Sequence, residues 1–497
     1  MARFGRCTVQ GAALVGVQAI PVDVEVAVTK GLPGFQIVGM VDAAVQEAKE
    51  RVRVALKSSG FEMPGDRILV SLAPSALKKT GSGYDLAIAA GILVATGQIA
   101  VSAVKGSLLV GELSLDGGIR PVKGLLAYAL CARDLGLALT CSQFADGLVP
   151  VEGLVEHGVF TLRDIAANRY ERFDYFPDHR AKNDADYCEI SGNEIAKRAF
   201  VIAAAGNHGV LMMGPPGSGK SMLAERLPSI MPPLTRSEML EAALVHSVAG
   251  EDLTGILSGI RPFRAPHHSA TGPALIGGGN PVRPGEISLA HHGVCFFDEL
   301  PEFKPSVLQQ LRQPLETGHV TIARADGSVT FPSSFLLVGA ANPCPCGYFG
   351  DPEHNCTCSE RRIRDYQNRI GGPLLDRIDM HLDVSRVPPV SVLSHTGGTN
   401  SATLRAKVLK GREYASWRTA HEELDGTTQG LIYSCHLSEG DERFLEKAAV
   451  TNGMSGRGIV RTLAIARTIA DINERKCVGK TEICEALGFR PRNKVGR

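Results

Sequence analysis

The segment 214–221, GPPGSGKS, limits the possible fold of this chain more than any other part of its sequence. It fits the pattern G-x-x-x-x-G-K-[ST], in which a glycine-rich loop turns backbone N–H groups toward a phosphate chain. The apolar run GVLMM precedes it and the helix-like run SMLAERL follows it. The sequence therefore predicts a strand, a phosphate-binding loop and a helix in succession, within an α/β nucleotide-binding core.

Each residue of this loop is expected to lie against the nucleotide. Lys220 is expected to reach the β- and γ-phosphates of ATP, and Ser221 to coordinate Mg²⁺. The predicted nucleotide-binding set is Gly214, Pro215, Pro216, Gly217, Ser218, Gly219, Lys220 and Ser221. A chance glycine-rich turn is the competing interpretation, and the flanking strand and helix weigh against it.

A second run, VCFFDE at 294–299, supplies what a phosphate-binding loop lacks. Its four apolar residues predict a buried strand that ends in two carboxylates. Asp298 is expected to hold Mg²⁺, and Glu299 to orient or deprotonate the attacking water. Acidic residues often end strands, but after a phosphate-binding loop the pair indicates ATP hydrolysis.

At 497 residues the chain is too long for one ordinary core, and a formal net charge of +1 gives no global basic field. The opening residues show no signal peptide, and no apolar run is long enough to cross a membrane, so a cytoplasmic protein without membrane contact is expected. In that compartment the 12 cysteines are expected to be thiols or metal ligands. Any nucleic-acid contact must come from local positive charge.

Composition and periodicity divide the chain into three domains and two linkers. Mixed α/β patterns, a charged and aromatic segment, a second α/β region, a segment rich in Pro, Gly, Ser and Thr, and helical periodicity follow one another. The predicted boundaries are 1–167, a linker at 168–187, an ATPase core at 188–388, a linker at 389–402, and a helical lid domain at 403–497.

Several longer stretches resemble the magnesium-chelatase-like family of AAA+ ATPases, the YifB/ComM group. The most specific is RPFRAPHHSATGPALIGGGNPVRPGEISLAHHGVCFFDELPEF at 261–303, and further matches lie at 192–224, 339–351, 372–384 and 455–472. Together with the N-terminal region the resemblance covers nearly the whole chain. It implies an AAA+ core with a C-terminal helical lid, a homo-oligomeric ring, expected to be a hexamer, and a DNA substrate.

The resemblance also assigns roles to single residues. Asn342, which ends the run FLLVGAAN, matches the polar residue that positions water near the γ-phosphate. Arg377 matches the arginine finger that reaches a neighbouring subunit's ATP. Arg457 matches the second sensor arginine, carried on the lid over the phosphates, and Arg461 is its alternative one helical turn later. Without the resemblance, Asn342 could equally be an ordinary turn residue. Arg377 could likewise belong to an ordinary Asp–Arg–Asp cluster on the surface.

Elements expected to face the ring pore lie between and beyond these motifs. An insert is expected between Ser221 and Asp298, and residues 316–334 predict a β-hairpin with ADGS as its turn. Arg324 in that hairpin is the candidate for pore contact. The pairs His267–His268 and His291–His292 are not predicted to bind metal, because adjacent side chains point in different directions. One departure from the family is Gly192–Asn193, where Gly-Gln is usual, so a contact at one end of the nucleotide is expected to differ.

Four of the cysteines are clustered in 344–359, CPCGYFGDPEHNCTCS. Cys344, Cys346, Cys356 and Cys358 can surround one tetrahedral Zn²⁺, although the C-x-C spacing is tighter than the usual C-x₂-C knuckle. His354 is an alternative fourth ligand, and a reduced loop without metal is the competing interpretation. A site closed by four protein ligands would be structural and not catalytic.

The N-terminal region, over 27–93, resembles the Lon-protease-type fold shared with S5-like domains. Proteolysis would require a nucleophilic Ser and a Lys, but the expected positions fall on Gly83 and Leu126. Ser82 and Lys123 lie one and three residues away from them. The domain is therefore expected to be a non-catalytic scaffold, for assembly or for DNA contact.

Three functions are compatible with these motifs. The first is a ring motor on DNA that drives branch migration or unwinding in recombination and natural transformation, as the resemblance implies. The second is a motor that remodels a protein or metal-insertion partner, as magnesium chelatase motor subunits do, and the third is an ATP-dependent protease. The missing dyad counts against the third, and the fused N-terminal domain disfavours the second.

Overall fold

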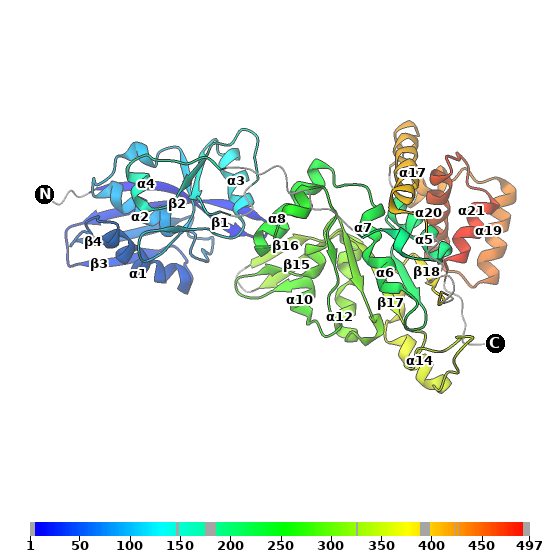
Figure 1. Ribbon diagram of the computed structural model, residues 1–497. Coiled ribbons are helices and arrows are strands. Elements are labelled where there is room, and N and C mark those ends of the chain that lie inside the picture. Colours follow the sequence, from blue (N-terminus) through cyan, green and yellow to red (C-terminus); the bar gives the residue numbers. More distant parts are fainter. Residues whose placement is uncertain are drawn as a thin grey trace.

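The computed structural model describes residues 5–145, 149–173, 185–324, 327–387, 398–422, 424–425 and 427–490. Most of both predicted linkers lies outside these residues, as do Ala325, Asp326 and the segment 491–497. Three parts follow one another along the molecule: an N-terminal α/β domain, a central α/β core and a C-terminal group of helices (Figure 1). Within the described residues, no helix is both long enough and apolar enough to cross a bilayer.

The N-terminal domain is built on a seven-stranded mixed sheet with the strand order β3-β4-β2-β1-β5-β8-β9. Alternating apolar residues on the second strand, such as Val22, Val24 and Val26, point into the core. The strands are β1 (Arg6–Val15), β2 (Gln18–Thr29), β3 (Gly34–Val38), β4 (Arg67–Ala73), β5 (Ser107–Leu109), β8 (Ala138–Ser142) and β9 (Glu156–Val159), with a small ribbon of β6 (Glu112–Leu113) and β7 (Ile119–Arg120).

Helices cover this sheet as the sequence periodicity predicts. Asp42 caps the first of them, where its side chain accepts a hydrogen bond from the Val45 N–H. The second helix is buried all round, so its sequence is apolar without a stripe. The helices are α1 (Ala43–Ser58), α2 (Asp85–Ala95), α3 (Leu125–Asp134) and α4 (Leu162–Ala166).

The central core contains a five-stranded parallel sheet with the order β11-β14-β17-β10-β18. Its three inner strands, β14, β17 and β10, are continuous apolar runs, as expected where both faces of a sheet are buried. The five strands are β10 (Val210–Met213), β11 (Phe263–Arg264), β14 (Val294–Phe297), β17 (Leu336–Ala341) and β18 (Met380–Asp383). The strands that carry the phosphate-binding loop, the acidic pair and Asn342 are thus adjacent, and all three end at the same edge.

The helices of this core are mostly short. They are α5 (Glu194–Gly206), α6 (Lys220–Glu225), α7 (Leu227–Ile230), α8 (Arg236–Ala249), α9 (Thr254–Leu257), α10 (Gly272–Ile276), α11 (Glu286–Leu289), α12 (Pro305–Gln310), α13 (Arg312–Thr317), α14 (Glu360–Asn368) and α15 (Gly372–Leu375). Two ribbons project from the core, one of β12 (Gly277–Gly278) and β13 (Arg283–Pro284), the other of β15 (His319–Arg324) and β16 (Gly327–Pro332). The predicted hairpin is thereby confirmed in its strands.

The C-terminal part is helical, as its periodicity predicts. It consists of α17 (Ser401–His421), α18 (Thr428–Ser434), α19 (Glu439–Thr451), α20 (Gly456–Ile472) and α21 (Lys480–Gly488). Residues of α17, α20 and α21 share one buried apolar cluster with α5 and the central sheet, so these helices pack directly on the core.

The N-terminal domain rests on α8 of the central core (Figure 1). Leu126 is fully buried there in a cluster with Leu234, Ala242, Ala243, Leu253 and Ile256. Polar contacts frame the cluster: the Gly124 N–H donates to the Ser247 carbonyl at 2.9 Å, and Lys123 Nζ to the Ala249 carbonyl at 3.0 Å. The interface therefore combines apolar burial with directed hydrogen bonds.

Candidate ATP-hydrolysis site

The phosphate-binding loop joins β10 to α6 at the carboxyl edge of the parallel sheet. Gly217 and Gly219 have φ angles of +74° and +85°, a left-handed conformation that glycine adopts without strain. The loop therefore curls over the start of α6, which begins at Lys220. This strand, loop and helix arrangement is the one that the motif predicts.

Lys220 lies at the centre of this loop and is mostly buried. Its Nζ donates to the carbonyls of Gly214 and Pro215 at 2.8 and 2.9 Å, and lies 3.4 Å from Oδ1 of Asn342. Burial lowers the pKa of Lys220, and the negative charge of Asp298 opposes that shift. The structure thus brings Lys220 and Asn342 together from two adjacent strands, as the predicted roles require.

The two predicted magnesium ligands also lie together. Ser221 Oγ donates to Oδ2 of Asp298 at 2.9 Å. A hydroxyl and a carboxylate are oxygen ligands of the kind that Mg²⁺ prefers, and both stand beside the loop that would hold the phosphates. The donor set therefore fits Mg²⁺ bound with ATP.

Glu299 adopts a left-handed conformation with φ of +50°, which non-glycine residues seldom adopt. Its N–H donates to Oδ1 of Asp298 at 2.9 Å, so the turn after β14 is closed by the neighbouring acid. Its side chain is exposed, and Oε2 lies 3.4 Å from Nδ1 of His268. His268 lies in the run 261–303, four residues after β11, which pairs in parallel with β14.

Arg377 lies elsewhere, before β18 at the amino edge of the sheet. Its guanidinium pairs with Glu316 and donates to the Pro373 carbonyl at 2.7 Å. Arg461 approaches the same edge, where Nη1 lies 3.5 Å from Oδ1 of Asp379. Because Asp379 accepts from the Gly209 N–H just before β10, the strand itself separates these arginines from the phosphate-binding loop.

Arg457 stands exposed one turn before Arg461 on α20. The four residues of β10 span about 13 Å at ~3.3 Å per residue, which is the order of the distance between the two sheet edges. Burial lowers the pKa of the Arg461 guanidinium, and Arg457 and Arg377 both lie close enough to lower it further, so the three arginines are neighbours at this edge. The role of Arg457 over the phosphates stays a prediction.

A cavity of about 820 Å³ adjoins the first two residues of the phosphate-binding loop. Sequence reasoning missed its lining, because these residues come from separate segments without a shared motif: Ile195, Phe349, His381, Val384, Arg386 and Gly488. Burial lowers the pKa of His381 to about 4. The only sequence signal was the departure at Gly192–Asn193, two positions that both have positive φ and lead into α5, where Ile195 lies.

The cysteine cluster follows Asn342 directly. Within the described residues, the Sγ atoms of Cys344, Cys346, Cys356 and Cys358 all lie within 4.8 Å of one another, so they could hold one zinc ion. His354 is not part of this group. Its Nδ1 accepts from Arg386 Nη1 at 3.0 Å, and its ring stacks on Tyr348.

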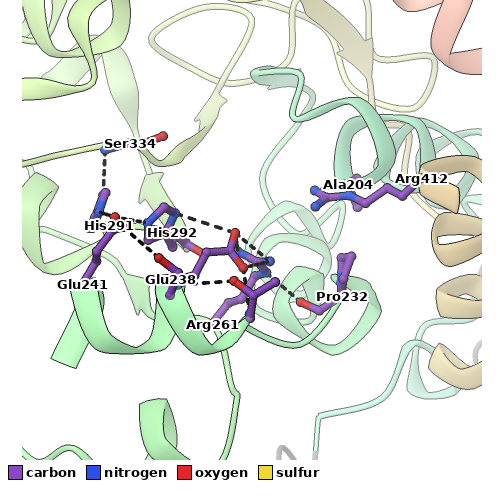
Figure 2. A network of polar contacts seen from close by, with 11 residues as sticks. Ala204, Pro232, Glu238, Glu241, Arg261, His291, His292, Ser334 and Arg412 are labelled. Atoms are coloured by element: carbon purple, nitrogen blue, oxygen red, sulfur yellow. Dashed lines mark hydrogen bonds and ion pairs between the residues drawn. The ribbon is translucent and has the colours of Figure 1, made fainter. Parts of the chain in front are cut away.

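His291 and His292, the second pair of adjacent histidines, form a hydrogen-bonded network with α8 (Figure 2). Nδ1 of His291 accepts from the Ser334 N–H at 3.0 Å, so its Nε2 carries the proton and donates to Glu241 at 3.2 Å. His292 Nε2 lies 2.8 Å from the same carboxylate. The three groups are close enough for a metal, but His291 already uses both nitrogens, and the network links α8 to the start of β14.

Arg324, the candidate for pore contact, is not free in this structure. Its guanidinium donates to the carbonyl of Gly279, in the turn between β12 and β13. The two projecting ribbons are thus tied together. A glycine at the first turn of the N-terminal domain, Gly16, lies close to Val329 and Thr330 of the hairpin.

The N-terminal domain brings no protease dyad together at the positions considered. Ser82 Oγ donates to Glu112, while the Lys123 amine is hydrogen-bonded to the Ala249 carbonyl of the central core. Gly83 has no side chain to offer, and Leu126 is buried in the interface with α8. Ser82 and Lys123 thus contact other groups and not each other.

Comparisons with known families match all three parts of the chain. The model described as "Magnesium chelatase, subunit ChlI" matches residues 186–392. "Subunit ChlI of Mg-chelatase" matches 24–141, and "Magnesium chelatase, subunit ChlI C-terminal" matches 398–490. The order of the three matches is the order of the three structural parts.

Similar proteins match nearly end to end. "Competence protein ComM" of Haemophilus influenzae is 42% identical over 491 residues, covering 96% of each chain. "Uncharacterized protein YifB" of Escherichia coli is 38% identical over 492 residues, again covering 96% of each. "Magnesium-chelatase 67 kDa subunit" of Chlorobaculum parvum is 27% identical over only 161 residues, which is 32% of this chain and 23% of that protein.

Proposed function

This chain belongs to the magnesium-chelatase ChlI-like family of the YifB/ComM group, and on that premise we propose that it is a Mg²⁺-dependent ATPase motor acting on DNA. One observation supports the proposal of ATP hydrolysis. Ser221 Oγ lies 2.9 Å from Oδ2 of Asp298, and the neighbouring Lys220 Nζ lies 3.4 Å from Oδ1 of Asn342. The family implies ATPase activity, and this geometry supports the choice of these residues for it.

Each residue has a distinct task. Ser221 and Asp298 hold Mg²⁺, which when bound neutralises charge on the β- and γ-phosphates. Lys220 leaves the carbonyls of its own loop to meet the phosphates, while Asn342 orients water near the γ-phosphate. Glu299, whose carboxylate projects into solvent beside them, accepts the proton of that water.

The arginines complete the site of a neighbouring subunit. Arg377 and Arg461 lie at the amino edge of the sheet, and the phosphate-binding loop lies at the carboxyl edge. A head-to-tail ring brings these two edges together between subunits, and a hexamer is the assembly we propose. Arg377 then stabilises the charge of the transition state in trans, with Arg457 or Arg461 beside it.

The substrate is proposed from similarity and not from the ATP site. The relative that matches over 96% of both chains is described as a competence protein, which favours a role in natural transformation and its recombination steps. Branch migration is the motor activity that suits that role. Remodelling of a protein or metal-insertion partner is the alternative, but the magnesium-chelatase subunit matches only a third of this chain.

The test is the steady-state ATPase rate without DNA and with single-stranded, duplex and four-way-junction DNA, at two salt concentrations. A DNA motor is stimulated by its preferred structure, and the stimulation fades at higher salt because phosphate contacts release counterions. Equal rates under every condition would remove DNA as the substrate. Glu299→Gln is the matched control, because it should retain ATP but lose turnover by at least ~100-fold.

A further inference from the structure

The four clustered cysteines lie between two parts of the proposed ATP site. Cys344 follows Asn342 by two positions and is fully buried. Gly347, with φ of +85°, packs so closely on the phosphate-binding loop that an added Cβ would lie 2.7 Å from Cδ of Pro216. The first half of the cysteine loop therefore touches both Asn342's strand and the loop that holds the phosphates.

The sulfur positions match those of a zinc site. Zn–S bonds of ~2.3 Å in a tetrahedron place the sulfur atoms about 3.8 Å apart. Sγ of Cys344 lies 3.3 Å from Cys346 and 3.7 Å from Cys356, and Cys346 lies 3.6 Å from Cys356. Cys358 lies within 4.8 Å of all three. The chain thus gathers four soft ligands around one point.

Other contacts fix the ligand set and the loop around it. His354, the alternative fourth ligand, is held by Arg386 and by stacking on Tyr348. The Cys358 N–H donates to Sγ of Cys356 at 3.4 Å, as backbone groups do around metal-bound thiolates. Four thiols without a cation would gain only weak hydrogen bonds from the same arrangement.

We propose that Cys344, Cys346, Cys356 and Cys358 bind one structural Zn²⁺ as thiolates, and that this ion positions Asn342 against the phosphate-binding loop. Binding displaces the thiol protons to solvent, so no oxidant or reductant takes part. The site is closed by four protein ligands, and the ion itself does no chemistry on ATP. The positioning role rests on the proposed ATPase function, whereas zinc binding does not.

Positioning follows from the route of the chain. Asn342 directly follows β17, and its Oδ1 lies 3.4 Å from Lys220 Nζ. The segment that follows is fixed at Pro343, whose carbonyl accepts from Gln367 of α14 at 2.9 Å, and then at Cys344. Without the ion, Cys344 and Gly347 lose their anchor to Cys356 and Cys358. Asn342 then no longer holds the attacking water at a fixed place near the γ-phosphate. This loss slows turnover more than it weakens ATP binding.

The first measurement is zinc per chain in the purified full-length protein by elemental analysis. We expect about one ion in wild type, a loss in Cys358→Ser, and retention in Cys358→His, because imidazole can replace a thiolate as a ligand. Cys477→Ser is the matched control, since Cys477 is an exposed thiol far from the cluster in sequence, and it should keep the ion. Co²⁺ in place of Zn²⁺ should show the intense visible bands of tetrahedral thiolate coordination.

The second measurement compares kcat, KM and binding of a fluorescent ATP analogue. Cys358→Ser should lower kcat about 10- to 100-fold with analogue affinity within about twofold, and Cys358→His should restore kcat. If Cys358→Ser fails to fold, chelation of zinc from wild type and its re-addition gives the same comparison.

The outcomes separate the proposals. Wild-type protein that neither contains nor takes up zinc overturns the site, even where its ATPase activity is normal. Zinc binding with a kcat insensitive to Cys358→Ser overturns the positioning role. Zinc-loaded wild type without ATPase activity overturns the proposed function instead and leaves the metal site standing.

Discussion

His268 Nδ1 lies 3.4 Å from Oε2 of Glu299, the residue proposed to accept a proton from the attacking water. Glu299 follows β14 by two positions, and His268 follows the adjacent parallel strand β11 by four. This contact occupies one carboxylate oxygen of Glu299 with an imidazole. The resting geometry therefore engages one oxygen of the proposed base with His268, while the side chain stays exposed to solvent.

Substitution His268→Ala should raise the basal ATPase rate by a factor of about 2 to 5, because both groups are partly exposed and such contacts are worth up to ~1 kcal/mol. The KM for ATP should stay unchanged. His267→Ala is the matched control, since His267 Nδ1 is hydrogen-bonded to Ser269 Oγ and not to Glu299. A rate that falls in His268→Ala would mean that the histidine orients Glu299 for catalysis and does not restrain it.

Mixed oligomers test whether Arg377 acts between subunits. Arg377→Ala should lower kcat by at least ~1000-fold, and Glu299→Gln should be similarly inactive. When the two variants are mixed, some interfaces pair an intact Glu299 with an intact Arg377, so activity should return in part. No recovery at any ratio would place the action of Arg377 within its own chain.

The ion pair between Arg377 and Glu316 should limit the ATPase activity of the protein. Glu316 neutralises the guanidinium in the isolated chain, so Arg377 must leave it to meet a neighbour's phosphate. Glu316→Gln should therefore increase ATPase activity at limiting protein concentration, where assembly restricts the rate. Glu302→Gln is a suitable control, because Glu302 pairs with Arg369 outside this edge.

The buried His291 should make stability depend on pH. Burial, and then the neighbouring His292, lower the pKa of His291 to about 4, against ~6.5 in the unfolded chain. The unfolded state then binds the extra proton between pH 6.5 and 4. The contribution of His291 is therefore fully present above about 6.5 and is lost as the pH falls toward 4, by up to about 3 kcal/mol.

Chemical denaturation at pH 7.5, 6 and 5 measures this effect. In His291→Gln the fall in the free energy of unfolding across that range should be smaller than in wild type. Protonation of Glu241 affects stability only at more acidic pH than this range, because the hydrogen bond from His292 lowers the pKa of the Glu241 carboxylate below its usual value. His319→Gln, an exposed histidine, should leave the pH profile as it is.

A buried ion cluster should be costly to break. Asp471 accepts from Arg418 at 3.0 and 3.1 Å and from Arg467 at 3.1 Å, and all three side chains are more than nine-tenths buried. Asp471→Asn leaves two guanidinium groups without their counter-charge, which should cost about 3 to 5 kcal/mol of unfolding free energy. Lys410→Gln breaks a half-exposed pair with Glu474 and should cost under about 1 kcal/mol.

The sequence predicted what local patterns encode. A glycine-rich loop between a strand and a helix needs no distant partner, so the interpretation of Lys220 and Ser221 as one site could be made without coordinates. Asp298 and Asn342 followed because parallel strands end at a common edge. Their contacts with Ser221 and Lys220 agree with this reasoning, although their catalytic roles stay predictions.

Contacts between distant segments could not be predicted in the same way. The run RPFRAPHH did not indicate that His268 would reach Glu299, and Glu316 reaches Arg377 from a helix before the hairpin. The position of Arg457 depended on where α20 packs, which helical periodicity alone does not determine. His354 had the right chemistry for a metal ligand, but Arg386 and Tyr348 hold it elsewhere.

Leu126 occupies the position that, by resemblance, corresponds to the catalytic lysine of a Lon-type domain. It lies on α3, fully buried against α8, where it helps to hold two domains together. A lysine at this place would bring an ammonium into an apolar contact, at a cost of several kcal/mol. A change to the residue type that a Lon-type dyad requires would therefore loosen the contact between the two domains.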